Sequence, residues 1–304
     1  MCYTHISLFA GAGGFDIGAA ENGFETQYAC DWEENSEQFF KNNFPDVPFD
    51  CTDVRNVTLD RINDVRGDKG LEPIKRGETD VLSGGSPCVK VSASNTTDAR
   101  DFAPENTLMI EDLPRIVHDI QPRIAVFENS DRLCAKSRSA LLMEIKASYN
   151  TLLPNYRYCV KVLNAKRFGA FQNRNRTIIV LIRKDVLNGR AVDFYPNRMN
   201  INLSKQGVTS ILPHVVAFSG GQFGKKFKTA TGKIFCTITA SVSQLVKESD
   251  LISRKITVDE CKKLTAMSEY DFSGICNTGI YTLLGNMIMR QLTRLLFQNF
   301  CKIL

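Results

Sequence analysis

THISLFAGAGGFDIGAAENGF, residues 4–24, combines a strand pattern, a glycine-rich turn and a helix pattern. The apolar run at 4–9 favours a β-strand, and residues 15–24 have the apolar spacing of a helix. Glycines between them let backbone amides approach a ligand closely, so the unit suits nucleotides and nucleosides alike. The glycine spacing differs from the fingerprint that binds a pyrophosphate, and no lysine follows in P-loop register. A tight turn without a ligand is the alternative interpretation.

The same alternation of strand and helix patterns continues along the chain. A helix is expected at 33–44, and strands are expected at 26–30, just before Asp53, and at 80–85, 123–130, 156–165 and 176–185. Such alternation predicts an α/β fold with a doubly wound, mostly parallel sheet of the Rossmann-like type. Ligands of these sheets gather at the carboxyl ends of the strands, where the acidic residues and glycines of this chain fall.

The amino-acid composition changes between residues 190 and 253. This segment is rich in Gly, Ser, Thr and Lys and shows short β-like pieces without a helical period. Helical spacing returns at 258–264 and 287–300. We therefore expect a first domain at 1–188 that residues 272–304 complete, and a smaller β-rich domain at 189–271.

Composition limits the possible classes of protein. With 304 residues, 43% hydrophobic and 23% charged, the chain is typical of a globular protein. It has no apolar run of membrane-spanning length, so a cytoplasmic location, or one associated with a nucleoid or nucleus, is expected. The ten cysteines form no C-x-x-C pair and none of the three histidines stands at metal spacing from them, so no metal is expected. The formal net charge of +5 fits a polyanionic partner without requiring one.

Acidic residues at two strand ends outline a nucleoside pocket. Asp31 can accept both hydroxyls of a ribose, and the adjacent Trp32, the only tryptophan, offers a flat apolar face to a purine. Asp53 can receive an adenine amino group. A tryptophan with a purely structural role is the alternative.

Cys88 follows Pro87 directly at the end of a predicted strand. Proline stiffens the turn and removes a backbone donor, which favours a presented thiol over a buried one. A single cysteine is usually structural, but Glu128 stands at another strand end, and Arg174 and Arg176 supply the cations that a thiolate or a bound heterocycle requires. A solvated arginine pair is the alternative for the last two.

Eight motifs in order resemble the motif series of the cytosine-C5 DNA methyltransferases of bacteria and phages. They are FAGAGG, DWE, TDV, GGSPC, ENS, QNRNR, RKITVDEC and LLGN, spread over essentially the whole chain. The resemblance implies a monomeric enzyme that acts on double-stranded DNA and converts S-adenosylmethionine to S-adenosylhomocysteine. Residues 189–271 would form its target recognition domain.

The resemblance also implies roles for individual residues. The catalytic set is Cys88, Glu128, Arg174 and Arg176. The cofactor set is Phe9, Ala10, Gly11, Gly13, Gly14, Asp31, Trp32, Asp53, Val54, Gly85, Pro87 and Asn286. The DNA-contacting set is Ser92, Gln222, Lys225, Lys226, Lys228 and Thr237.

The chemistry explains these residue types. Attack of the Cys88 thiolate on cytosine C6, while Glu128 holds N3 and the amino group, makes C5 nucleophilic enough to take a methyl group. The target base has to leave the duplex, and the loop that follows Cys88 is the expected lid. The family usually has glutamine after the cysteine and valine after Glu-Asn, where this chain has Val89 and Ser130, and it commonly has Ser-Arg in the lid, where this chain has Glu105-Asn106.

Three alternatives remain open at this point. The same fold and thiol chemistry can act on transfer RNA, although the sizeable 190–253 region favours DNA. The chain can be an inactive DNA-binding homologue, against which the joint presence of Cys88, Glu128 and Arg176 argues. A modified methyl group can come from an altered cofactor. The sequence does not reveal the DNA site or whether a restriction enzyme accompanies the protein.

Overall fold

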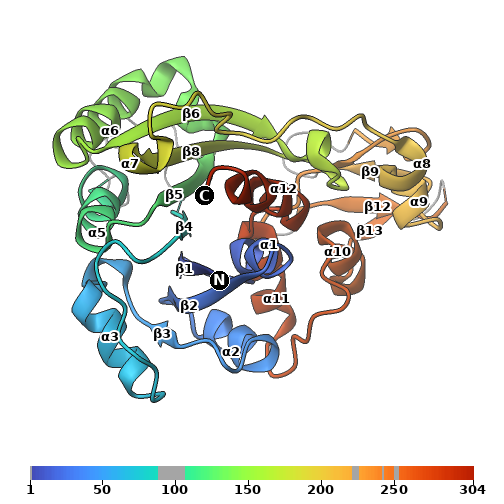
Figure 1. The fold of residues 1–304 in the computed structure, drawn as a ribbon. Helices are drawn as coiled ribbons and strands as arrows, with labels where there is room; N and C mark the ends of the chain where they lie inside the picture. Colours follow the sequence, from blue (N-terminus) through green and yellow to red (C-terminus); the bar gives the residue numbers. More distant parts are fainter. Residues whose placement is uncertain (1, 88–106, 221–225, 242, 250–252) are drawn as a thin grey trace.

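A large central sheet organises the computed structural model, which describes residues 2–87, 107–220, 226–241, 243–249 and 253–304 (Figure 1). Its strands have apolar residues on both faces, as expected for a sheet covered on both sides. In chain order they are β1 (Tyr3–Leu8), β2 (Phe24–Asp31), β3 (Phe49–Cys51), β4 (Val81–Gly85), β5 (Ile124–Ser130), β6 (Tyr156–Asn164) and β8 (Asn175–Arg183).

The strand order is β3-β2-β1-β4-β5-β8-β6. Neighbours from β3 to β5 pair in parallel, whereas β8 is antiparallel to both β5 and β6. The predicted doubly wound, mostly parallel sheet is confirmed. The order reverses at β1 and β4, so the crevice at the carboxyl ends of these two strands is where a ligand is expected.

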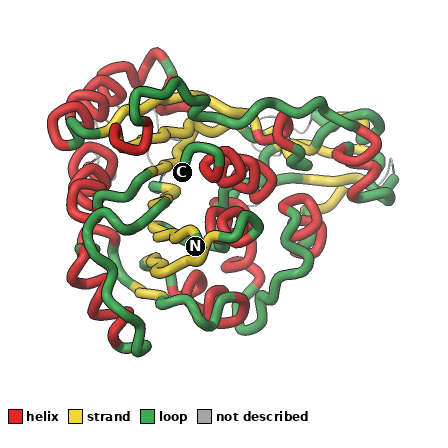
Figure 2. Tube along the Cα trace, viewed as in Figure 1, coloured by secondary structure: helices red, strands yellow, loops and turns green. Residues whose placement is uncertain are grey.

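Helices cover both faces of the sheet (Figure 2). One face packs its apolar residues against α3, α5 and α6, and the other against α1 and α12. The helices longer than one turn are α1 (Gly14–Ala20), α2 (Glu34–Asn43), α3 (Leu59–Gly67), α5 (Leu113–Ile120), α6 (Ser139–Leu152), α10 (Val258–Thr265), α11 (Asn277–Asn286) and α12 (Arg290–Cys301). None of the described helices is long and apolar enough to cross a membrane.

α1 and α12 approach each other closely because α1 carries small residues. A Cβ added at Gly14 would lie 2.6 Å from the carbonyl oxygen of Ile288, and one at Gly18 would lie 2.5 Å from Oγ1 of Thr293. The Thr293 hydroxyl donates to the Gly14 carbonyl at 2.7 Å. The packing of α12 against the start of α1 therefore stabilises the glycine-rich turn.

Short elements make up the region between the two parts of the sheet domain. One small sheet has the order β10-β9-β12-β13, and β11 pairs in parallel with β7. The region was expected to lack helices, but its described residues include the single-turn helices α8 (Leu203–Gln206) and α9 (Val208–Ile211). Its strands are β9 (Ala217–Ser219), β10 (Lys228–Thr229), β11 (Phe235–Cys236), β12 (Leu245–Lys247) and β13 (Ser253–Lys255). The partner of β11, β7 (Gln172–Asn173), and the single-turn helix α7 (Lys184–Leu187) precede the region in the chain.

One apolar core joins this region to the large domain. It combines Phe235 and Val246 of the small sheets with Phe39 of α2 and Leu284 of α11. α11 thus contacts both parts of the molecule, and the boundaries at 189 and 271 stay a prediction.

Candidate active site

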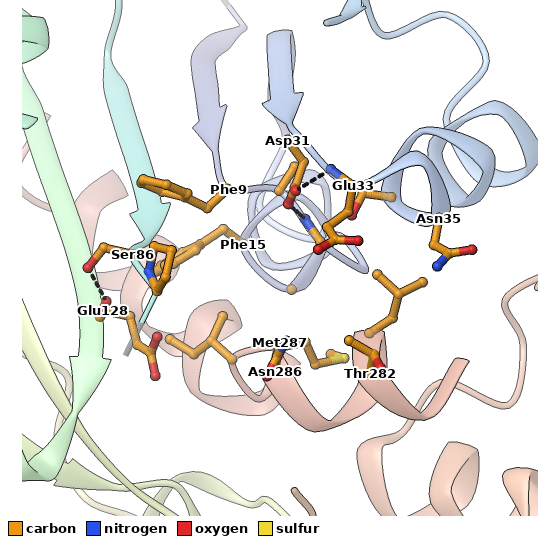
Figure 3. A pocket seen from close by; sticks show the side chains of 18 of the residues that line it. Phe9, Phe15, Asp31, Glu33, Asn35, Ser86, Glu128, Thr282, Asn286 and Met287 are labelled. Carbon is orange, nitrogen blue, oxygen red and sulfur yellow. Dashed lines mark hydrogen bonds between the residues drawn. The ribbon is translucent and has the colours of Figure 1, made fainter. Parts of the chain in front are cut away.

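Two adjoining cavities lie at the carboxyl ends of β1, β2, β4 and β5, and Figure 3 shows the first of them. We call the first, of about 220 Å³, the central cavity, and the second, of about 210 Å³, the side cavity. They share Phe9, Asp31, Trp32 and Pro87. The central cavity is also lined by Ala10, Gly11, Gly14, Phe15, Glu33, Asn35, Ser36, Gly85, Ser86, Glu128, Arg176, Gly279, Thr282, Leu283, Asn286, Met287 and Ile288. The side cavity adds Cys30, Thr52, Asp53, Val54, Arg55 and Leu108.

The turn after β1 forms one wall of both cavities. Gly11 and Gly13 have φ values of 55° and 66°, in the left-handed region that glycine adopts without strain. Phe9 has a φ of 50°, which is uncommon for a residue with a side chain and often marks a functional site. This conformation places Phe9 in the lining of both cavities, as the cofactor assignment requires.

Asp31 faces the central cavity from the end of β2. One carboxylate oxygen accepts the amide of Gly11 at 2.9 Å, and the other accepts the amide of Glu33 at 3.1 Å (Figure 3). Burial raises the pKa of Asp31, and these two amides act in the opposite direction. Each oxygen keeps a lone pair after these bonds, so the carboxylate can also accept two hydroxyl groups.

Trp32 is 65% exposed although it lines both cavities. A tryptophan that served the core would be buried, so this geometry argues against a structural role. The exposed indole offers an apolar surface to a flat ligand at the junction of the cavities.

Asp53 and Val54 form the rim of the side cavity. Val54 is buried and begins the 3₁₀ turn η1 (Val54–Asn56), which Asp53 caps. Both Asp53 oxygens contact the Arg55 guanidinium, and this hydrogen bonding lowers the pKa of Asp53. A bound amino group would share this carboxylate with Arg55.

Glu128 and Arg176 form a buried ion pair on the floor of the central cavity. Nε of Arg176 lies 2.5 Å from Oε1 of Glu128, and the two side chains are 16% and 8% exposed. Burial raises the pKa of Glu128, whereas Arg176 and Arg174 lower it. The antiparallel pairing of β5 and β8 produces this contact, because Ser130 and Arg176 are register partners.

Arg174 has different surroundings from Arg176. It is 1% exposed and is not among the described residues that line the central cavity. Its guanidinium donates to the carbonyls of Ile238 and Gly285, both at 2.7 Å. The two arginines of the expected catalytic set therefore differ in position. Arg176 lines the central cavity, whereas Arg174, between β7 and β8, holds the segment after β11 and the end of α11.

Asn129 is a residue that the sequence interpretation did not single out. Its amide nitrogen donates to Ser86 Oγ at 2.9 Å, and its oxygen accepts the amide of Ser130 at 2.8 Å. Ser86 precedes Pro87 and Cys88, so Asn129 fixes the strand end that leads to the cysteine. The position of Asn129 next to Glu128 at the end of β5 was the available signal.

Some predicted residues lie outside the described part of the chain. They are Cys88, Ser92, Gln222 and Lys225. Pro87, the last described residue before Cys88, lines both cavities. Lys226 and Lys228 are exposed, and Thr237 donates to the carbonyl of Asn173 at 2.9 Å, next to the strand pair β7–β11.

One group of potential metal ligands occurs among the described residues, away from the cavities. The ligand atoms of His214, Glu248 and Glu260 lie within 4.8 Å of one another. Arg254 makes ion pairs with both glutamates, so the group forms a network of charges that joins β13 to α10.

The residues of the two cavities fit S-adenosylmethionine. Glycine-turn amides, an aspartate with free lone pairs and an exposed indole match a ribose and an adenine. The buried hydroxyl of Ser36, near the start of α2, lines the central cavity beside Asp31 and helps to lower the pKa of that carboxyl, although the two groups do not reach hydrogen-bond geometry. A polar group of a ligand bound at Asp31 would lie within reach of this hydroxyl as well.

Comparison with known proteins identifies the family to which this chain belongs. The family model of the C-5 cytosine-specific DNA methylases matches residues 3–215. The type II methyltransferase M1.HphI of Haemophilus parahaemolyticus is 34% identical over 187 residues, which are 61% of this chain and 47% of that protein. M.HhaI of the same species is 28% identical over 182 residues, 60% of this chain and 49% of that protein. The chain spans about half the length of these curated relatives.

Solved structures resemble the whole chain. A Spodoptera frugiperda DNMT2 variant superposes with a TM-score of 0.67 and 16% identity over 98% of this chain and 99% of that one. At this level of identity the similarity supports the fold alone.

Proposed function

Because this chain belongs to the C-5 cytosine-specific DNA methylase family, we propose that it transfers a methyl group from S-adenosylmethionine to C5 of cytosine in double-stranded DNA. The observation that carries the proposal is the shared lining of the cavities. Cofactor-type residues such as Asp31 and Trp32 stand in the same chamber as the Glu128–Arg176 pair, next to Pro87. A methyl donor and a cytosine bound there would be neighbours.

Glu128 is suited to hold the base edge. Its buried carboxyl has a raised pKa, so it can present a proton to N3 while its other oxygen accepts from the amino group. Arg176, bound to the same carboxyl, orients it and supplies positive charge beside the ring. Activation of the ring requires this hydrogen bond to N3, because it draws electrons away from C6.

Cys88 is the proposed nucleophile. Its sulfur forms a bond to C6, C5 then takes the methyl group that S-adenosylmethionine supplies, and loss of the C5 proton expels the thiolate. Asn129 fixes Ser86 and thereby the approach of the chain to Cys88. The cytosine has to be flipped out of the duplex to reach this chamber.

Sequencing of 5-methylcytosine in DNA from a host that expresses the protein tests the proposal. We expect methylation in one sequence context in cells that express the wild-type protein. Cells that express Cys88→Ala to the same level are the matched control and should show none. Unmethylated DNA together with saturable cofactor binding would contradict it, and methylated transfer RNA would move the activity to RNA. Cellular location and oligomeric state stay predictions.

A further inference from the structure

The QNRNR segment alternates between two environments. Gln172 and Arg174 are buried, whereas Asn173 and Asn175 are exposed. Gln172 accepts the amide of Ile238 at 3.0 Å, so the buried residues anchor the small sheets. The exposed asparagines point to the opposite side, because successive side chains of a strand alternate.

Asn164 fixes which way these two amides face. Its oxygen accepts the backbone amide of Lys166 at 3.1 Å, and a backbone amide can only donate. Its nitrogen therefore faces the oxygens of Asn173 at 2.8 Å and of Asn175 at 2.6 Å. Both asparagines must present their NH₂ groups outward, so this asparagine cluster of residues 164, 173 and 175 offers hydrogen-bond donors to solvent.

A basic groove adjoins the asparagine cluster. It has a volume of about 420 Å³, Asn173 lies in its wall, and Lys166, Lys228 and Lys233 are its charged lining residues. No acidic residue is among the described residues that line it, and none of the three lysines has an ion-pair partner in the described chain. The groove thus carries uncompensated positive charge.

The cluster connects this groove to the candidate active site. Asn175 precedes Arg176 of the central cavity, and the Arg176 guanidinium donates to the Asn175 carbonyl at 2.7 Å. Asn173 lies at the other end, in the groove. Because side chains alternate along a strand, Arg176 and Asn175 point to opposite faces of β8. A ligand that leaves the central cavity therefore has to pass the start of β8 before it meets the outward donors and then the lysines.

We propose that the asparagine cluster and the basic groove hold the phosphodiester backbone of the DNA strand that carries the target cytosine. This inference rests on the proposed function. Phosphate oxygens accept hydrogen bonds and are negatively charged, and a surface of donors and cations without acids complements them. Because the donors belong to neutral amides, they contribute affinity without adding to its salt dependence.

Two sets of variants separate these contributions when duplex DNA binding is measured against salt concentration. Asn173→Ala with Asn175→Ala is expected to weaken binding about tenfold, as loss of two neutral hydrogen bonds implies, with an unchanged salt slope. Glutamine at the three lysine positions is expected to reduce the slope of log K against log salt by roughly 0.9 per lysine that contacts a phosphate. Asn150→Ala and Lys146→Gln, on the exposed surface of α6, are the matched controls and should leave both quantities unchanged.

Cofactor binding and thermal unfolding of each variant should match the wild type, which shows that the site and the fold are intact. Wild-type affinity and slope in both sets, in a protein that binds and methylates DNA, would overturn this inference and leave the proposed function standing. A wild-type protein that binds cofactor but neither binds nor methylates DNA would overturn both. The same losses for transfer RNA, without DNA binding, would overturn the assignment to DNA.

Discussion

Replacing Arg176 with glutamine leaves the buried carboxylate of Glu128 without its ion-pair partner. The two groups are 2.5 Å apart, and the carboxylate side chain is only 8% exposed. Removal of one partner of a buried ion pair typically costs about 3–5 kcal/mol, because the other charge stays buried. Arg174 also acts on the charge of Glu128, and Arg176 is partly exposed, so we expect Arg176→Gln to lower the free energy of unfolding by about 2–3 kcal/mol at pH 8.

This loss should depend on pH in a defined direction. Burial already raises the pKa of Glu128, and removal of Arg176 raises it further. Between the unfolded pKa and this raised value the folded variant binds more protons than the unfolded chain, so its stability falls as the pH rises. The deficit of Arg176→Gln relative to wild type should therefore be largest at pH 8 and shrink towards pH 4.5, the ordinary value for glutamate.

Urea unfolding of the wild type, Arg176→Gln, Glu128→Gln and the double variant at several pH values measures these quantities. Glu128→Gln removes the buried charge, so the double variant should be more stable than Arg176→Gln at pH 8, with a coupling energy of about 1–3 kcal/mol. A pH-independent deficit, or a double variant less stable than both single variants, would refute the buried ion pair.

Two further predictions concern the cofactor site and the small sheets. Addition of S-adenosylmethionine should change the fluorescence of Trp32 saturably, and Trp32→Ala should weaken its binding with unchanged thermal unfolding; a spectrum indifferent to saturating cofactor would contradict the placement. The pKa of Glu260 is lowered to about 2 because its hydrogen bonds to Arg254 and His214 outweigh its burial, so its contribution to stability is present above about pH 4.5 and lost as the pH falls towards 2. Glu260→Gln can keep the capping hydrogen bonds of α10, and it should lower the free energy of unfolding by about 1–2 kcal/mol at neutral pH. The difference in melting temperature between this variant and the wild type should vanish in acid. A difference that stays constant with pH would argue against the ion pairs.

The large sheet was predictable because its strands carry strong local signals. β5 begins with the apolar run Ile124–Phe127 before its polar end, and the glycine turn marks the point where β1 passes into α1. Parallel strands bring their carboxyl ends to one edge, so Asp31 and Glu128 could be placed together from sequence alone. Both line the central cavity.

The orientation of the QNRNR segment was not predictable. All five side chains are polar, so no apolar residue indicates which face is buried, and Arg174 was grouped with Arg176 although it contacts backbone carbonyls elsewhere. The small sheets were not predictable either, because strands of two or three residues are too short to show an alternation of apolar and polar side chains. Their core depends on contacts with α2 and α11, which are distant in sequence.

Covalent capture of DNA at Cys88 tests the central claim most directly. With 5-fluorocytosine at the target position, sulfur addition and methyl transfer proceed but fluorine cannot leave as the proton does, so the adduct persists. We expect an adduct that requires both DNA and S-adenosylmethionine, survives denaturing electrophoresis, forms more slowly with Glu128→Gln and is absent with Cys88→Ser. An adduct that forms equally well with Cys88→Ser, or no adduct in a protein that binds both DNA and cofactor, would contradict the proposed thiol chemistry.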